Sequence, residues 1–481
     1  MLRSTVRFPV SGCQTTVASV RQLSSRCHHQ KSKPKPKPAK PKPESQLKKE
    51  ENINAYKSKA SVSDILNSVP HAPAPEKAAV TNIKYVPNQD IKEPGGTLQF
   101  KALDRYGKHV DRALHAIWLR DHCQCPECVH PVTKQRQIDT FSIPKRLYIL
   151  NAEVDESKGK VDVWFSDGHH TTYTMNQLIA RISPAHDYRA RNGPHEPILW
   201  GREIKKAPPV VDYKKVMTSD EGVRDWTYWI KRYGFCYVDG CPVTPEATQE
   251  LLERIAFIRH THYGGFWDFT ADMASNDTAY TNLALGAHTD NTYFTDPARL
   301  QMFHLLSHEG GEGGESLLVD GFKVAMDLKK EAPRHYEILT RTKFYSHASG
   351  NEGISIFPQE PEPAFRQYGR HLYQIRWNNY DRDGLQPPVE NWPLWYQSAR
   401  TWDRMLKDPK NEYWEQLIPG RPLIFDNWRI LHGRSAFTGQ RRLCGGYINS
   451  DDFMARYRAL NFPNKGIMPW MLEDGGEGTD A

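Results

Sequence analysis

One segment near the C-terminus, RPLIFDNWRILHGRSAFTGQRRLCGGYINSDD, restricts the possible folds more than any other part of the chain. It contains two apolar stretches, residues 422–431 and 443–448, separated by a polar segment with glycines. Short apolar stretches bounded by turn residues are typical of buried β-strands. His432 closes the first expected strand, and Arg441 and Arg442 open the second. We therefore expect one rigid sheet that holds an imidazole and a guanidinium on neighbouring strands.

An earlier motif, Gly286-Ala-His288-Thr-Asp290, supplies an imidazole and a carboxylate two residues apart. On extended backbone such side chains point to the same face. Together with His432 they give two histidines and one carboxylate, the set that non-haem Fe(II) oxygenases place on one side of an octahedral ion. A His-x-Asp sequence alone is common, and a histidine in a surface turn is the usual alternative. The later His432 and the arginine nine residues after it favour the metal site.

Four stretches of the sequence carry more information than these single residues. They read His288-Thr-Asp290-Asn291-Thr-Tyr293-Phe294, Leu318-Val-Asp-Gly-Phe322, Asn378-Asn-Tyr-Asp-Arg382 and Asp426-Asn-Trp-Arg-Ile-Leu-His432-Gly-Arg434. Over residues 82–465 the chain resembles the family of γ-butyrobetaine and trimethyllysine dioxygenases, and it is more similar to the trimethyllysine dioxygenases. The resemblance implies an α+β fold, mainly β with flanking helices, in which a double-stranded β-helix (jelly roll) holds iron at its open end.

The resemblance also implies that His288, Asp290 and His432 bind Fe(II) and leave three positions open. 2-Oxoglutarate would occupy two of these positions and O2 the third. The far carboxylate of 2-oxoglutarate needs a planar, permanently charged partner, which Arg441 provides, although the adjacent Arg442 leaves the choice open. Succinate and CO2 are the expected co-products, and ascorbate is expected to keep the iron ferrous. No catalytic side chain beyond the ligands is expected.

A quaternary ammonium group has no hydrogen to donate, so aromatic faces must recognise it. The resemblance places Tyr263, Trp267 and Tyr280 in such a cage, whereas an aromatic core is the alternative. Asp277 is the candidate partner of the α-ammonium of trimethyllysine, or it caps a turn instead. Asn378 is the candidate for the substrate carboxylate.

The expected reaction is hydroxylation of C3 of N6-trimethyllysine, the first step of carnitine biosynthesis. The first alternative is hydroxylation of γ-butyrobetaine, which lacks the α-ammonium. A second alternative is a non-catalytic protein that binds methyl-lysine through the aromatic cage. The sequence disfavours this last possibility, because a binding protein would need neither the three metal ligands nor Arg441.

Three cysteines within six residues, Cys123-Gln-Cys125-Pro-Glu-Cys128, predict a second metal site. A pair of histidines, His169-His170, follows an apolar strand and can supply an imidazole. Three thiolates and one imidazole form a closed tetrahedral zinc site, which is structural because no position is left for water. Free thiols are the alternative. The resemblance implies His169 as the fourth ligand, with His170 one residue later as the alternative.

The N-terminus differs in composition from the rest of the chain. The net charge is +7, but residues 1–43 contain ten Lys or Arg and no acid, so the remainder sums to 7 − 10 = −3. A basic, Ser-containing N-terminus without acids is typical of an organellar transit peptide, and the Lys-Pro repeats that follow predict an extended spacer. We expect the mitochondrial matrix, with the cytoplasm as the alternative. Neither nucleic acid nor membrane is an expected partner, since the remainder is acidic and no long apolar run exists.

A chain of 481 residues exceeds one typical domain. The expected organisation is a transit peptide and spacer (1–43), a disordered segment (44–81), a small all-β domain with the zinc site (82–190), a linker (191–211), the dioxygenase domain (212–465) and a tail (466–481). The family suggests a homodimer.

Local patterns predict elements within these domains. In the small domain, apolar runs predict strands at residues 98–100, 116–119, 147–150 and 161–165. In the dioxygenase domain, Thr218-Ser-Asp-Glu221 is a capping box ahead of a helix, and Thr244-Pro245 starts another. A strand is predicted between them at residues 234–238, and further helices at 321–332 and 390–406.

Overall fold

The structure is a computed structural model that describes residues 80–86, 96–103, 109–182, 195–270, 281–386 and 388–462. The expected transit peptide and spacer, most of the segment expected to be disordered, the tail, and the predicted site residues Asp277 and Tyr280 lie outside this range. Within the described residues, each helix is too short or too polar to cross a lipid bilayer.

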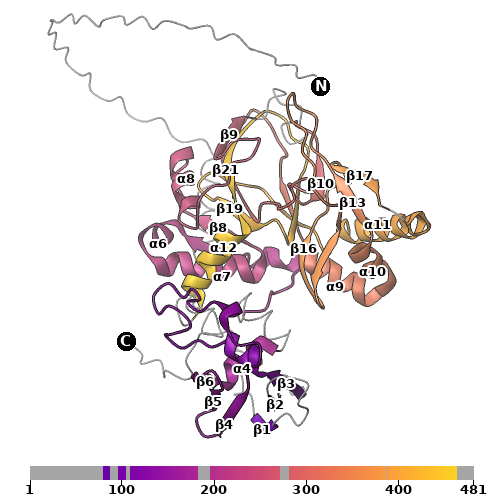
Figure 1. Ribbon diagram of the computed structural model, residues 1–481. Coiled ribbons are helices and arrows are strands. Elements are labelled where there is room, and N and C mark those ends of the chain that lie inside the picture. Colours follow the sequence, from indigo (N-terminus) through magenta and orange to yellow (C-terminus); the bar gives the residue numbers. More distant parts are fainter. Residues whose placement is uncertain are drawn as a thin grey trace, which may run out of the picture. The chain divides into compact units, whose positions relative to one another are not determined.

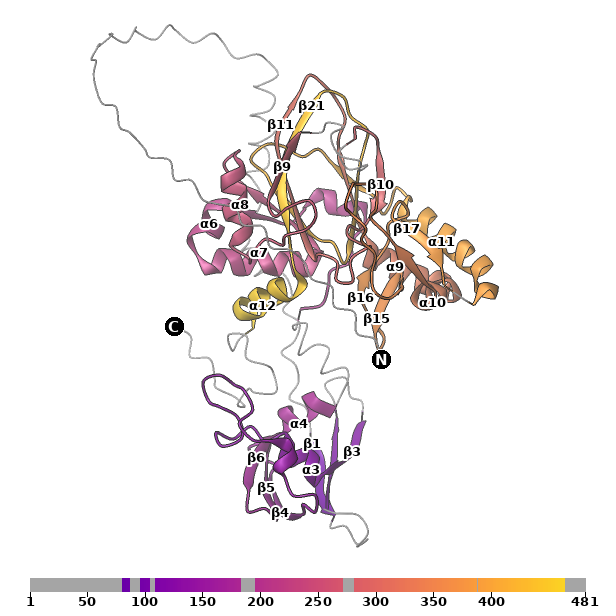
Figure 2. The same cartoon turned by 45° about the horizontal axis from the view of Figure 1, so that its top comes forward.

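The small domain consists of two antiparallel three-stranded sheets and short helices (Figure 2). Its strands are β1 (Val80–Val86), β2 (Thr97–Leu103) and β3 (His109–His115) in one sheet, and β4 (Ile149–Asp155), β5 (Lys160–Phe165) and β6 (His170–Thr174) in the other. Along β5, Val161, Val163 and Phe165 are buried and the residues between them are partly exposed, which is the period of a strand with one face on the core. The first described strand, β1, starts at Val80, two residues before the expected domain boundary at residue 82.

One predicted strand of this domain is a helix, so the domain is not all-β. Residues 116–119 belong to α3 (Ala116–Asp121), and α4 (Met175–Ile182) follows β6; a short 3-10 helix, η1 (Thr140–Ser142), lies between the sheets in sequence. Ala116, Leu119 and Arg120 are buried and occupy positions i, i+3 and i+4, which share one helical face. An apolar run of four residues is too short for its periodicity to distinguish a helical turn from a strand.

The dioxygenase domain is built on two sheets with helices on both sides (Figure 1). The larger sheet has the order β7 (Val210–Asp212), β8 (Phe235–Asp239), β19 (Leu423–Asp426), β11 (Leu300–Glu309), β21 (Gln440–Ile448), β9 (Trp267–Thr270). The smaller sheet has the order β10 (Leu285–His288), β20 (Ile430–Arg434), β12 (Ser316–Asp320), β18 (Tyr413–Glu415). The chain alternates between them, with β10, β12 and β20 in one sheet and β11, β19 and β21 in the other. This alternation is the connectivity expected of a jelly roll.

Two smaller sheets contain the remaining strands of this domain among its described residues. One contains β14 (Glu362–Pro363), β13 (Lys343–Ser346) and β17 (Arg382–Leu385), and the other contains β15 (Phe365–Tyr368) and β16 (His371–Ile375).

The stretch predicted as a single strand at residues 422–431 is two strands in different sheets. β19 ends at Asp426, whose Oδ1 accepts the N–H of Trp428 at 3.1 Å and whose carbonyl accepts the N–H of Arg429 at 2.9 Å. A side-chain oxygen bonded two residues ahead makes a turn, and the chain passes into β20 of the other sheet. His432 therefore lies inside β20, and Arg441 lies on β21 of the other sheet rather than on a neighbouring strand.

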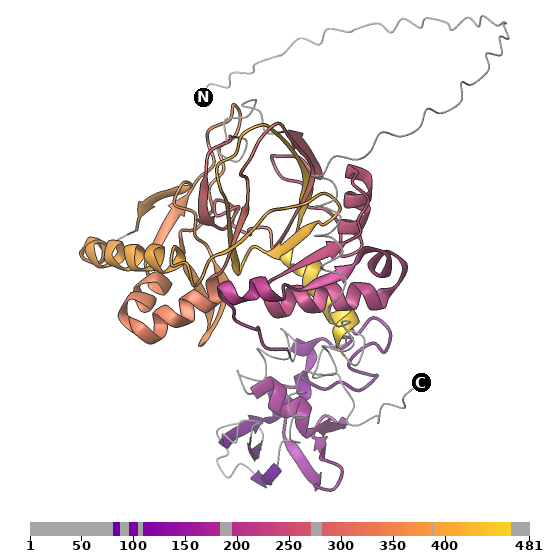
Figure 3. The same ribbon diagram turned by 180° about the vertical axis from the view of Figure 1, so that it is seen from behind.

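The helices form two groups on opposite sides of the strands (Figures 1 and 3). One group is α6 (Tyr213–Thr218), α7 (Asp220–Tyr233), α8 (Pro245–Glu253) and α12 (Ser450–Asn461); the other is α9 (Gly321–Glu331), α10 (Pro333–Arg341) and α11 (Trp392–Leu406), the last preceded by η4 (Val389–Asn391). Thr244 caps α8 as predicted, since its side chain accepts the N–H of Ala247. The cap of α7 is Ser219, one residue later than predicted, because the Thr218 hydroxyl instead donates to a carbonyl of α6.

Residues 195–211, expected to belong to a linker, pack into the dioxygenase domain. They contain η2 (Arg202–Lys206) and the edge strand β7. Trp200 is 3% exposed, and its Nε1 donates to the carbonyl of Tyr233 at 2.7 Å. The prolines of this segment suggested a linker, but its aromatic and aliphatic side chains bind it to the core.

Candidate active site

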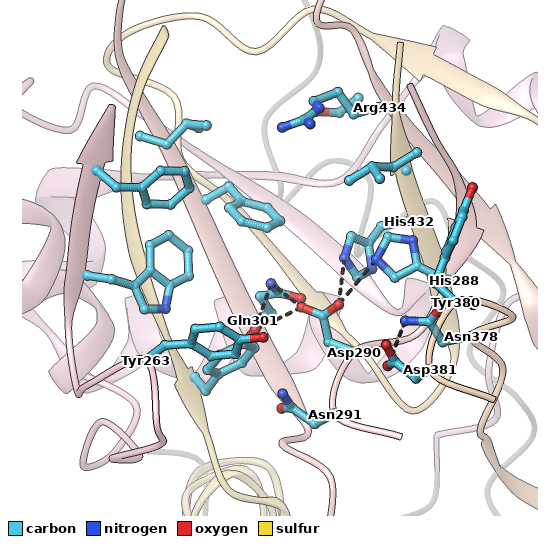
Figure 4. Close-up of a pocket in the computed structure, with 18 of the residues that line it drawn as sticks. Tyr263, His288, Asp290, Asn291, Gln301, Asn378, Tyr380, Asp381, His432 and Arg434 are labelled. Carbon is cyan, nitrogen blue, oxygen red and sulfur yellow. Dashed lines mark hydrogen bonds and ion pairs between the residues drawn. The ribbon is translucent and has the colours of Figure 1, made fainter. Parts of the chain in front are cut away.

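A cavity lined by both sheets of the dioxygenase domain brings three predicted metal ligands together (Figure 4). His288 ends β10, His432 lies opposite it on β20, and Asp290 occupies the turn after β10. Oδ1 of Asp290 lies 3.2 Å from Nε2 of His288 and 3.6 Å from Nε2 of His432. The donor atoms of the three side chains all lie within 4.8 Å of one another. The set can bind an ion from one side, as non-haem iron sites do.

Neighbouring groups orient these donors. Nδ1 of His288 lies 2.8 Å from the carbonyl of Gly286, to which it donates a hydrogen, and this leaves the lone pair on Nε2. Oδ2 of Asp290 accepts hydrogen bonds from Nε2 of Gln301 and from the hydroxyl of Tyr447, both at 2.8 Å. Oδ1 therefore faces the two imidazoles. Contacts of this kind fix ligand orientation in metal sites.

The electrostatics of the site keep Asp290 ionised and His432 neutral, whereas Asp290 raises the pKa of His288 above its ordinary value despite burial. Burial raises the pKa of the Asp290 carboxyl, but the imidazoles of His432 and His288 and the hydroxyl of Tyr447 lower it more, so this pKa falls below its usual range. Burial and the neighbouring His288 lower the pKa of His432 to about 3, so its ring is neutral. An ionised carboxylate beside a neutral imidazole fits a divalent cation.

Arg441 and Arg442 have different surroundings. Arg441 is 3% exposed and lines the cavity, and its Nε has no hydrogen-bond partner among the described residues. Burial, with a smaller effect of Arg434, lowers the pKa of Arg441 to about 10, which still leaves it cationic at neutral pH. Arg442 is exposed and pairs with Asp268, with Nε 2.8 Å from Oδ1. Only the first of the two neighbours can meet an anion in the cavity.

Two of the three predicted cage residues line the same cavity. The Tyr263 hydroxyl lies 3.2 Å from that of Tyr293, and the Trp267 ring packs against Tyr447 with centroids 6.2 Å apart. Tyr293 and Tyr447 were not predicted as site residues. Arg441 and Tyr447 lie six positions apart on β21, an even offset, so the period of the strand was a signal that could have placed Tyr447 on the cavity side.

Asn378, the candidate for the substrate carboxylate, lines the cavity, and so does Asp381, which was not predicted as a site residue. Nδ2 of Asn378 donates to Oδ2 of Asp381 at 2.8 Å. Oδ1 of Asn378 accepts the backbone N–H of Tyr380 at 3.0 Å, which defines the orientation of the amide. The signal for Asp381 was its place in the Asn378-Asn-Tyr-Asp-Arg382 stretch.

The predicted zinc ligands also converge, in the small domain. Nε2 of His169 lies 3.3 Å from Sγ of Cys123, 3.7 Å from that of Cys125 and 3.6 Å from that of Cys128. His170 points elsewhere, stacks on Trp164 and lies 3.2 Å from Asp162. Burial raises the pKa of the Cys123 thiol to about 12 and also raises that of Cys128, so only a bound cation would keep these thiols ionised.

Comparison with known proteins identifies the family. The model of the taurine catabolism dioxygenase TauD, TfdA family matches residues 194–447, and that of the N-terminal region of γ-butyrobetaine hydroxylase-like proteins matches residues 105–179. A trimethyllysine dioxygenase of Neurospora crassa is 46% identical over 423 residues, which cover 80% of this chain and 88% of the relative. The chain belongs to the trimethyllysine dioxygenase family.

Other relatives agree with this placement. The human mitochondrial trimethyllysine dioxygenase is 38% identical over 350 residues, covering 72% of this chain and 82% of the relative. A γ-butyrobetaine dioxygenase of a Pseudomonas species is more distant, at 29% identity over 351 residues, covering 72% of this chain and 90% of the relative. The family predicted from the sequence is confirmed, and so is the coarser part of the predicted fold, an oxygenase domain of sheets with flanking helices. A trimethyllysine dioxygenase family member requires Fe(II) and 2-oxoglutarate, and the cavity offers donors for both.

Proposed function

We propose that this enzyme hydroxylates C3 of N6,N6,N6-trimethyl-L-lysine with O2 and 2-oxoglutarate, giving 3-hydroxy-trimethyllysine, succinate and CO2. This reaction is the entry step of carnitine biosynthesis. The observation that carries the proposal is the 46% identity to a trimethyllysine dioxygenase over 88% of that protein. The γ-butyrobetaine dioxygenase relative, at 29% identity, is more distant.

His288, Asp290 and His432 would hold the iron, and Arg441 would anchor the far carboxylate of 2-oxoglutarate as a bidentate partner. Bound iron and 2-oxoglutarate supply the oxidising chemistry that inserts one oxygen atom of O2 into a C–H bond. The side chains position the reactants: Gln301 and the hydroxyl of Tyr447 keep Asp290 turned toward the histidines. Ascorbate would keep the iron ferrous.

The same cavity would bind the substrate. Tyr263 and Trp267, together with Tyr280, would surround the trimethylammonium group, which only aromatic faces can recognise. Asn378 would bind the substrate carboxylate, because its Nδ2 carries two hydrogens and the contact to Asp381 uses one. Asp277 remains a predicted partner of the α-ammonium.

We further propose a structural zinc ion at Cys123, Cys125, Cys128 and His169, supported by the convergence of three thiols and one imidazole. The human relative is named as mitochondrial, which supports import of this enzyme into the matrix, with the cytoplasm as the alternative. A homodimer is the expected assembly.

A direct test incubates the purified full-length protein anaerobically with Fe(II) and 2-oxoglutarate, then adds O2 with trimethyllysine or γ-butyrobetaine in parallel. Trimethyllysine should gain the mass of one oxygen atom while succinate forms in equal amount. A faster reaction with γ-butyrobetaine than with trimethyllysine would mean that the enzyme is a γ-butyrobetaine hydroxylase. Binding of trimethyllysine without formation of succinate would mean that the protein binds methyl-lysine but does not catalyse the reaction.

A further inference from the structure

Asp290 differs from the other two predicted iron ligands because it lies outside the sheets. His288 and His432 are paired across β10 and β20, so the two strands fix the positions of their backbones. Asp290 lies in the turn after β10. Hydrogen bonds from Gln301 and Tyr447 orient its carboxylate, but they do not hold its backbone. Another part of the fold must therefore fix the position of this turn.

The side chain of Asn427 makes the hydrogen bonds that hold the backbone of Asp290. Its Oδ1 accepts the backbone N–H of Asp290 at 2.7 Å, and its Nδ2 donates to the carbonyl of Asp290 at 3.0 Å. Nδ2 also donates to the carbonyl of Ala298 at 2.9 Å, and the backbone N–H of Asn427 donates to the carbonyl of Arg299 at 2.7 Å. One side chain thus satisfies both backbone groups of the ligand residue, as a residue on a neighbouring strand would.

These contacts require an amide at position 427. Asn427 is 1% exposed, and both hydrogens of its Nδ2 are donated to backbone carbonyls. An amide offers an acceptor and two N–H donors, whereas a carboxylate of the same shape offers acceptors only. An aspartate here could still accept the N–H of Asp290, but its second oxygen would face two carbonyl oxygens without a hydrogen to donate. Buried groups left unpaired in this way destabilise the arrangement.

The place of Asn427 in the chain connects Asp290 with the second histidine. Asn427 lies in the turn between β19 and β20, and His432 follows five residues later within β20. The residue after Asp290, Asn291, has a φ of +59°, in the left-handed region that residues other than glycine seldom adopt. Such a conformation persists where the surrounding contacts impose it. The turn that leads into the strand of His432 therefore also holds the turn of Asp290.

We propose that Asn427 is a positioning residue of the iron site, whose amide fixes the backbone of Asp290 where its carboxylate and the imidazole of His432 can share one ion. The proposal rests on the proposed function, since it concerns the same iron site. Asn427 is not among the described residues that line the cavity, so it acts on the metal through Asp290. Loss of a partner that orients a metal ligand commonly weakens metal affinity by about tenfold to a hundredfold.

The test is an anaerobic Fe(II) titration of the full-length Asn427→Asp variant in the presence of 2-oxoglutarate, followed by the visible charge-transfer absorption of the Fe(II)–2-oxoglutarate complex. The Kd for Fe(II) should rise about tenfold to a hundredfold over that of the wild type. Asn427→Ala removes the same three side-chain hydrogen bonds without adding a charge, and it should show a rise in the same range. Thermal unfolding checks that each variant is folded.

Asn411→Asp is the matched control. Asn411 is also 1% exposed, its Nδ2 donates to the carbonyl of Met405 at 2.8 Å, and it lies in the turn between α11 and β18. This variant should bind Fe(II) as the wild type does.

Three results would overturn the inference: an unchanged Kd in a folded Asn427 variant, an equal rise in Asn411→Asp, or failure of both Asn427 variants to fold. The last result would mean that the fold, rather than the metal site, requires the amide. Failure of the proposed function looks different, because the wild type itself would then bind no Fe(II) or would not hydroxylate trimethyllysine.

Discussion

Arg441 and Arg442 provide a test at the scale of single residues, because adjacent positions on a strand face opposite sides. Arg441→Lys keeps the charge but loses the planar pairing, so the KM for 2-oxoglutarate should rise at least about tenfold. Steady-state kinetics with varied 2-oxoglutarate measure the change. Arg442→Lys is the matched control and should leave this KM unchanged, because Arg442 is exposed and pairs with Asp268. A larger rise of this KM in Arg442→Lys than in Arg441→Lys would mean that Arg442 binds 2-oxoglutarate.

Tyr447 allows a test of the hydrogen bonds that orient the metal ligand Asp290. Tyr447→Phe keeps the ring in the cavity but removes one of the two hydrogen bonds to Oδ2 of Asp290. Loss of a partner that orients a ligand commonly weakens metal affinity by about tenfold or more. Anaerobic titration with Fe(II) should show this weakening while the fold is retained. Unchanged affinity would mean that Gln301 alone is sufficient.

The individual site residues differed in how readily the sequence disclosed them. His288, Asp290 and His432 were predicted from the His-x-Asp spacing and the later His432, and their donor atoms do lie together, although Asp290 lies in the turn after β10 and not on the strand. Asp381 was missed although it belongs to the Asn378–Arg382 stretch, because it lies in a turn and no periodicity indicates which way a turn side chain faces. The choice between His169 and His170 was open for a similar reason and depended on where β6 begins.

At the scale of elements, His304 joins β11 to α8 and to the turn before β19. It is completely buried; its Nδ1 donates to the Thr248 hydroxyl at 2.6 Å, and its Nε2 accepts the N–H of Gly420 at 3.0 Å. Burial lowers the pKa of His304 to about 4. Between pH 6.5 and 4 the unfolded chain binds a proton here that the folded chain does not, so stability falls as the pH falls.

This difference should cost about 2 kcal/mol of unfolding free energy between pH 7 and pH 5. His304→Gln removes the titrating group, so the variant should lose less stability over this interval than the wild type, by about that amount. Urea unfolding at the two pH values measures it. His308→Gln, on the same strand, should keep the loss of the wild type. Parallel pH profiles for wild type and His304→Gln would contradict the assignment.

The elements that the sequence predicted correctly are those with strong local signals. The cap of α8 and the alternating strand β5 are examples. The errors arose where tertiary contacts determine the secondary structure. The turn closed by Asp426 divides one apolar run into strands of two sheets. In α3, the three buried residues form a helical face that is too short to recognise from the sequence. The prolines of residues 195–211 concealed a segment whose buried Trp200 joins the core.

At the scale of the whole molecule, the proposed iron and zinc sites belong to different domains and should load independently. His169→Ala should reduce the zinc content from about one ion per chain to near zero, because it removes one of four ligands, and iron binding should persist. His432→Ala should lose iron binding and keep about one zinc ion per chain. Elemental analysis of both variants checks this, with His170→Ala as a control that keeps both metals. Loss of both metals in either variant would show that the sites are coupled.

The central claim is that two histidines on neighbouring strands of one sheet, with a carboxylate in the turn after the first of these strands, bind the iron that directs oxygen from O2 onto trimethyllysine. The most direct test is turnover under ¹⁸O2 followed by mass analysis of the product. We predict one ¹⁸O atom in the new hydroxyl group, succinate formed in equal amount, and neither product in His432→Ala. Oxygen derived from water, or the same product from His432→Ala, would contradict the account.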